Sequence, residues 1–273
     1  MTMLILIVEG LLIGCLLGLT GAGGGILAVP ALMTSQGWSV AQAAPVGLLA
    51  ITLAAFVGVV QGLIQGHIRY KAAIWIALVS IPSAKYGVYL ANVISPQWLT
   101  LAFSLVMCVV AYRTLFKLVS DSDNALCKIN QQTGRFIWNF KTASILGGVG
   151  IIAGLLTGLL GVGGGFVIVP ALRKLTNLNI KSIIATSLMV IFLIGGISIS
   201  INLLNGFEYP LDISATFILS CVVGLIIGRI MIHYISALRI QILFGILVML
   251  VAAYLLYSFI SFVVVVNGIP HLF

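Results

Sequence analysis

The stretch GLTGAGGGILAVPAL at residues 18–32 occurs again as GLLGVGGGFVIVPAL at residues 158–172. The two copies are 140 residues apart and share ten of fifteen positions. Each copy follows a long apolar run, and a proline (Pro30 or Pro170) stands five residues after its last glycine. Because each glycine costs a helix about 1 kcal/mol relative to alanine, the three consecutive glycines predict a break in each helix. Two breaks at matching places predict a duplicated fold with its working parts at the breaks.

The composition is typical of an integral membrane protein. Of the 273 residues, 62% are hydrophobic and 7% are charged, and the mean hydropathy is +1.27. A soluble domain needs a charged surface, which this chain cannot supply. No basic residue precedes the first apolar run, which continues into the first glycine break, so we expect a membrane segment there and not a cleaved signal peptide.

The net charge of +8 makes nucleic-acid binding an alternative to consider. The basic residues lie between apolar segments, which instead indicates the positive-inside rule, and we expect no nucleic-acid partner. The cysteines are widely scattered and form no CxxC pair, so we expect neither a disulfide framework, a metal site nor a cofactor. They are Cys15, Cys108, Cys127 and Cys221.

Apolar segments of about 20 residues, long enough to cross a bilayer, are predicted in both halves. They cover residues 3–20, 43–65, 72–94, 97–118, 142–160, 180–204, 211–233 and 239–266, with short arms at 26–33 and 166–173. The polar stretch 34–42 is predicted as a loop. We expect a first membrane repeat at 1–118, a cytoplasmic linker at 119–141 and a second membrane repeat at 142–273.

The positions of the charges predict the topology. If each glycine-broken segment crossed the membrane once, the linker and the basic loop after residue 172 would lie on opposite sides, which violates the positive-inside rule. If each segment enters and returns to the same side, each half makes three net crossings and the halves are inverted. Twelve of the thirteen Lys and Arg then lie in the cytoplasm. They are Arg69, Lys71, Arg113, Lys117, Lys128, Arg135, Lys141, Arg173, Lys174, Lys181, Arg229 and Arg239.

The predicted fold is therefore an all-α polytopic membrane protein of two inverted repeats. Each repeat has a glycine-broken re-entrant helix pair and three transmembrane helices, so the chain has about eight hydrophobic segments in all.

A glycine break followed by a short helix exposes free N–H groups at a helix N-terminus, whose partial positive charge favours anions. Two inverted copies would direct two such ends at one central substrate-binding site. The predicted glycines of this site are Gly21, Gly23, Gly24, Gly25, Gly161, Gly163, Gly164 and Gly165. The alternative is close helix packing, for which membrane proteins also use small residues. A nucleotide-binding loop is excluded because no Lys-Ser/Thr pair follows either copy.

The two motifs resemble the twice-repeated signature of the TauE/SafE sulfite exporter family, and the resemblance covers the size, duplication and prolines of the whole chain. Ala185-Thr186-Ser187-Leu188 looks like the polar patch that follows the family's motif, whereas the first copy has Pro45-Val46-Gly47-Leu48 without hydroxyls. The resemblance implies transport of small sulfur-containing anions such as sulfite, sulfonates or thiosulfate. It also implies substrate contacts from Thr186 and Ser187, and a bacterial inner membrane.

Two ionisable residues lie inside predicted spans, where a charge costs about 3 kcal/mol and is a functional hypothesis by default. Lys85 is predicted to contact the substrate anion, to extend its amine toward the membrane surface, or to pair with a carboxylate such as that of Glu9. Glu9 is predicted either to carry a coupling proton or to reach the outer headgroups.

The predicted function is secondary transport of a small anion by alternating access between inverted halves. An ion channel, a transporter of another small solute and a membrane-embedded enzyme are alternatives. The enzyme is disfavoured because His, Asp and Cys do not cluster beside the spans, and the channel because no ring of acids is visible. The expected partners are the anion and the bilayer, with homodimerisation left open.

Overall fold

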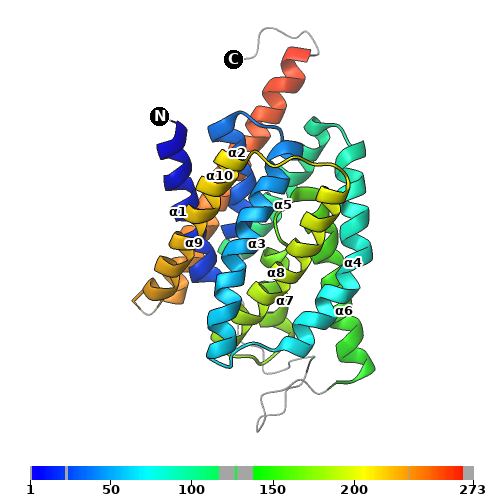
Figure 1. Cartoon of the computed structure of the whole chain (residues 1–273), viewed down its shortest axis with the longest axis vertical. Coiled ribbons are helices and arrows are strands. Elements are labelled where there is room, and N and C mark those ends of the chain that lie inside the picture. Colours follow the sequence, from blue (N-terminus) through cyan, green and yellow to red (C-terminus); the bar gives the residue numbers. More distant parts are fainter. Residues whose placement is uncertain (1, 22–23, 117–126, 128–137, 233, 267–273) are drawn as a thin grey trace.

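The computed structural model is all-helical over the residues it describes, which are 2–21, 24–116, 127, 138–232 and 234–266 (Figure 1). The prediction of an all-α fold is confirmed. The helices of the first half are α1 (Thr2–Thr20), α2 (Gly24–Gln36), α3 (Val40–Ile64), α4 (Tyr70–Val93) and α5 (Pro96–Phe116). Those of the second half are α6 (Phe140–Leu160), α7 (Gly165–Leu175), α8 (Ile180–Leu204), α9 (Leu211–Met231) and α10 (Ala237–Val266).

Eight of the described helices are long and apolar enough to cross a bilayer, which confirms the predicted polytopic architecture. The two shorter helices are α2 and α7, and each follows a glycine break. Large apolar side chains are exposed on the outer helices, as at Leu4, Phe116 and Leu250, where lipid would cover them. The chain is a multi-pass membrane protein.

The prediction of a loop at residues 34–42 is wrong for most of its length, because three residues separate α2 from α3. Hydroxyls extend α2, since Thr34 Oγ1 and Ser35 Oγ each donate to the carbonyl of Ala31 at 2.9 Å. The start of α3 is capped by Gln42, whose Oε1 accepts from the backbone N–H of Ser39 at 3.1 Å. Polar residues here therefore satisfy helix ends instead of forming a loop.

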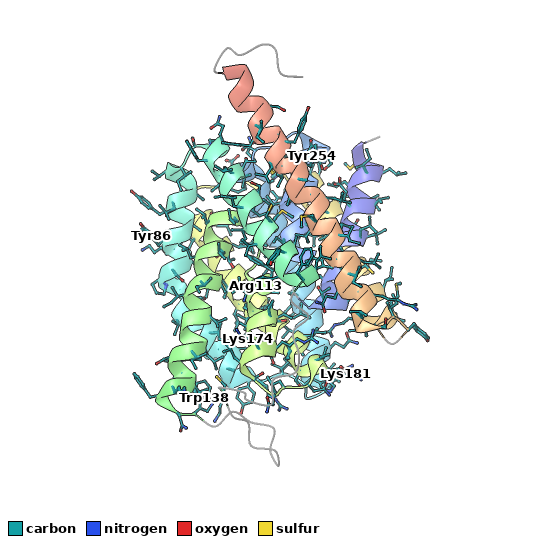
Figure 2. The ribbon with its side chains drawn as sticks, turned by 180° about the vertical axis from the view of Figure 1, so that it is seen from behind. Tyr86, Arg113, Trp138, Lys174, Lys181 and Tyr254 are labelled. Carbon is teal, nitrogen blue, oxygen red and sulfur yellow. The ribbon has the colours of Figure 1, made fainter. Side chains whose placement is uncertain are left out.

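The helix pairs of one half have counterparts in the other. α1 packs along α9 as α6 packs along α4, and α3 packs on α9 as α8 packs on α4. α3 and α8 also pack on each other, as do α5 and α10. In Figure 1, α1 runs downward from the N-terminus, whereas in Figure 2 α6 (green) runs upward from Trp138, so these two helices run in opposite directions.

Glycines at four-residue intervals allow the paired helices to approach closely, a feature that the sequence analysis did not use. In α1, a Cβ on Gly10, Gly14 or Gly18 would collide with α9, and in α6 a Cβ on Gly150, Gly154 or Gly158 would collide with α4. In a membrane, where lipid is as apolar as a side chain, such close backbone contact drives helix association. These interfaces hold α1 and α6, and therefore the glycine breaks at their ends, in place.

We expect Gly150→Ala to destabilise the protein and Gly148→Ala, on the same helix, not to. A Cβ at position 150 would lie 2.6 Å from the carbonyl oxygen of Ile76, whereas nothing lies within 4 Å of one at position 148. Overpacking costs about 1–3 kcal/mol, whereas alanine in an open helical site stabilises by up to about 1 kcal/mol. The apparent midpoint of thermal unfolding in detergent, measured for each variant, tests both effects. Equal midpoints for Gly150→Ala and Gly148→Ala would contradict this account of the interface.

Candidate transport site

The second glycine break has a backbone conformation that requires glycine. α6 ends at Leu160, and Gly161 follows with φ +67°. Gly163 and Gly164 also have positive φ, +74° and +63°, before α7 begins at Gly165. A side chain at any of these left-handed positions would be strained. The predicted break at 161–165 is therefore present, and α7 starts directly after it.

The first break is similar where the structure describes it. α1 ends at Thr20, and Gly21 has φ +71°. Gly23, predicted as a backbone donor, lies outside the described residues. Gly24 is already the first residue of α2, and a Cβ on it would collide with the carbonyl of Ile13 in α1. The chain thus turns at the break and packs back on the helix that it came from.

The two breaks meet inside the protein. A Cβ on Gly25 would lie 2.6 Å from the carbonyl oxygen of Val162. Ile51 of α3 reaches both breaks, since its methyl carbons would lie 3.5 Å from a Cβ on Gly25 and 3.7 Å from one on Gly163. Similarly, a methyl carbon of Ile191 in α8 would lie 3.2 Å from a Cβ on Gly163. Segments 140 residues apart are therefore in contact in the buried centre of the fold.

The charge at this centre comes from the backbone. The first N–H groups of a helix have no acceptor within the helix. In α7, Val167 and Ile168 donate to the carbonyl of Gly164 at 3.0 and 3.2 Å, which leaves Gly165 and Phe166 at the tip of the helix. The tip of α2 begins with Gly24 and Gly25 in the same way. Two helix N-termini, each with partial positive charge, therefore lie close together in the buried centre, as do the C-terminal ends of α1 and α6 at the same breaks.

A pocket of about 310 Å³ leads to the second break. Its walls are the first turns of α3, the last turns of α4, α6 and α8, and the loop after α8, and Gly161 forms part of its lining. The amides of Asn92, Asn202 and Asn205 give it hydrogen-bonding groups, and none of its described lining residues is charged. None of these three asparagines was predicted from the sequence as a site residue, although Asn205-Gly206 matches Gln65-Gly66 of the first half and so indicates a repeated helix end.

The side chains that follow the second motif contact the first break. Ser187 Oγ lies 2.8 Å from the carbonyl oxygens of Gly21 and Ile184, either of which can accept its proton. Thr186 Oγ1 accepts from the backbone N–H of Arg69 at 3.0 Å. Both hydroxyl residues are fully buried. Thr186 and Ser187 thus join α8 to the first break and to the α3–α4 loop.

The structure does not bring Lys85 or Glu9 to the breaks. Lys85 is exposed on α4 beside Tyr86 and Tyr89, which are 58% and 62% exposed, and it does not line the pocket. Tyr86 lies at the edge of the molecule in Figure 2. Glu9 is half-buried on α1 near Ser35, at the far end of α2 from Gly24. Neither residue therefore lies at a break or in the pocket, and their predicted roles stay predictions.

Nearly the whole chain matches a known protein family and known membrane proteins. The family described as sulfite exporter TauE/SafE matches residues 6–255. A "probable membrane transporter protein" of Xylella fastidiosa (strain Temecula1) is 30% identical, and the match covers 94% of this chain and 95% of the relative. The "probable membrane transporter protein YjnA" of Bacillus subtilis is 26% identical over 82% of this chain and 87% of the relative. No solved structure matches the chain.

We expect Gly161→Ala to destabilise the protein more than Gly206→Ala. Both glycines have positive φ, +67° and +79°, so each substitution introduces backbone strain of about 1–2 kcal/mol. A Cβ at position 161 would also lie 2.5 Å from the Cβ of Ala44, whereas nothing lies within 4 Å of one at position 206. The difference between the two apparent melting temperatures therefore reports how tightly the break is packed, and no difference would show that the break is loose.

Proposed function

This chain belongs to the sulfite exporter TauE/SafE family of membrane transporters, and we propose that it carries small sulfur-containing anions such as sulfite, sulfonates or thiosulfate. The observation that supports this substrate class is the contact between the two glycine breaks, which brings the tips of α2 and α7 close together, next to a pocket that reaches Gly161. Sulfur oxyanions offer several acceptor oxygens to backbone N–H groups. The site needs no cofactor in this proposal.

The proposed site consists mainly of backbone groups. The glycines at 21, 24, 25, 161 and 163–165 allow the chain to turn and to pack closely at the breaks, where the peptide N–H groups would bind the anion. Thr186 and Ser187 hold the first break through their hydroxyls. The proposal assigns no substrate contact to Lys85 and no coupling role to Glu9, because both lie away from the breaks.

Alternating access between inverted halves is the proposed mechanism. The opposite directions of α1 and α6 and the matching helix pairs support it. The pocket is open at the start of α3, whereas the end of α3 is closed over the first break by Thr186 and Ser187. An inverted repeat supplies two such routes, of which one is open at a time.

The end of the molecule next to the linker is the proposed cytoplasmic end. Lys174 and Lys181 lie there with Trp138 in Figure 2. Lys117, Lys128 and Arg135 lie outside the described residues. With basic loops inside, the membrane potential favours export, by about 2.3 kcal/mol per charge per 100 mV. Export of an anion therefore needs no coupling ion.

Sulfite flux through proteoliposomes should respond to an imposed potential. The account predicts that uptake of radiolabelled sulfite is faster when the vesicle interior is positive and slower when it is negative, because the anion moves alone with its charge. A potassium gradient with valinomycin sets the potential. Flux that does not change with the sign of the potential would count against uncoupled anion transport.

Matched glycine variants link this flux to the breaks. Gly164→Leu should abolish it, because position 164 has φ +63° and a Cβ there would lie 2.8 Å from the carbonyl oxygen of Ala153. Gly37→Leu is the control, since it introduces similar backbone strain at φ +68° with nothing within 4 Å. Full flux through a membrane-inserted Gly164→Leu variant would show that the site lies elsewhere.

A further inference from the structure

Arg229 is a half-buried charge at the end of α9. Its Nη1 donates to Oε1 of Gln61, near the end of α3, at 2.7 Å. Its Nη2 would lie 3.7 Å from a Cβ on Gly58, so the guanidinium lies against α3. Among the described residues no carboxylate pairs with it. The nearest acid on its own helix is Asp212, in the first turn, about 26 Å away at 1.5 Å per residue.

This arginine has more hydrogen-bonding capacity than its described partner uses. A guanidinium has five N–H donors, and the Gln61 amide oxygen accepts from one of its nitrogens. Charged side chains within membrane spans normally pair with an opposite charge or face a functional pathway. The Gln61 amide brings no negative charge to the guanidinium, and the planar fork of donors matches an oxyanion.

Arg229 lies beside the last turn of α1, which ends at the first break. A Cβ on Gly18 of α1, one turn before the first break, would lie 3.1 Å from the backbone nitrogen of Arg229. A Cβ on Gly58 would also contact Leu188 of α8, at 2.8 Å. The helices that meet here are α1, α3, α8 and α9. Their counterparts in the repeat, 140 residues away in the sequence, are α6, α8, α3 and α4, and these four helices line the pocket.

The hydrogen bonds that close this end have no equivalents at the pocket. By the same shift, Val46 and Gly47 stand in place of Thr186 and Ser187. Tyr89 and Ile201 stand in place of Arg229 and Gln61. Val46, Gly47 and Ile201 have no polar side-chain atom and Tyr89 has no guanidinium, so the bonds made at the linker end are not repeated at the pocket.

We propose that Arg229 is an anion-binding residue of the linker-side route, and that its bond to Gln61 holds this route closed together with the Thr186 and Ser187 bonds. The inference rests on the proposed anion transport. When the route opens, α3 and α9 separate, Gln61 leaves the guanidinium, and the free donors bind the oxygens of a small oxyanion. The competing explanation is that Arg229 only anchors the end of α9 at the membrane surface.

Transport from each side separates the two explanations. In membrane vesicles of both orientations, Arg229→Gln should raise the half-saturating concentration of thiosulfate about tenfold from the linker side, as expected for one lost charged hydrogen bond, and leave the other side little changed. Arg229→Lys should give a linker-side half-saturating concentration between those of the wild type and Arg229→Gln, because lysine keeps the charge but lacks the planar fork of donors.

The matched control is Arg239→Gln, an exposed arginine in the first turn of α10 at the same end of the protein. A surface-charge effect would weaken both glutamine variants equally and would overturn the proposal. An Arg229→Gln variant with unchanged half-saturation from both sides would also overturn it.

Cysteine labelling tests the closing bonds without any transport. In a chain that lacks its native cysteines, Ile184→Cys reports on the linker end beside Gly21, and Ala44→Cys reports on the pocket beside Gly161. Adding Gln61→Leu should raise labelling of position 184 by an impermeant thiol reagent several-fold and lower labelling of position 44. Unchanged labelling would overturn the closing role even if the wild type moved no thiosulfate, whereas a loss of transport alone would refute only the proposed function.

Discussion

The structure depends on one constraint, which is that a peptide group inside a bilayer needs a hydrogen-bond partner that lipid does not provide. A helix satisfies this constraint everywhere except at its ends. Here two helices end within the fold, at Thr20 and Leu160, and the unpaired groups lie against protein instead of lipid. The glycine-faced contacts of α1 with α9 and of α6 with α4 keep those ends buried. In the proposed function, the N–H groups at the starts of α2 and α7, and not the carbonyls at the ends of α1 and α6, are the groups that would bind an anion.

The two halves share a framework but differ in the side chains that close it. Ile51 and Ile191 occupy equivalent places beside the breaks, and Gly21 and Gly161 have nearly the same φ, +71° and +67°. The hydroxyl of Ser187 is present at one end only, since Gly47 replaces it at the other. The pocket lies on the side that lacks the counterpart of the Ser187 bond, so the two halves differ in packing as well as in sequence.

Much of the fold could be predicted from the sequence because its signals are local. Long apolar runs and consecutive glycines gave the spans and both breaks, with helix ends displaced by a few residues where Thr34, Ser35 and Gln42 cap them. The direction in which a side chain points is not local. Lys85 faces outward although it lies within a span, and Arg229 reaches α3, which no spacing along the chain indicates. Thr186 and Ser187 were expected to contact substrate, whereas their hydroxyls bond to the α3–α4 loop and the first break.

The most direct test is a structure of the protein with selenite, in which selenium replaces the sulfur of sulfite and is located by its anomalous scattering. The account predicts a selenium peak between the tips of α2 and α7, with oxygens within hydrogen-bonding distance of the N–H groups of Gly25 and Gly165. A peak at a site remote from both breaks, with the space between the tips filled by side chains, would contradict it.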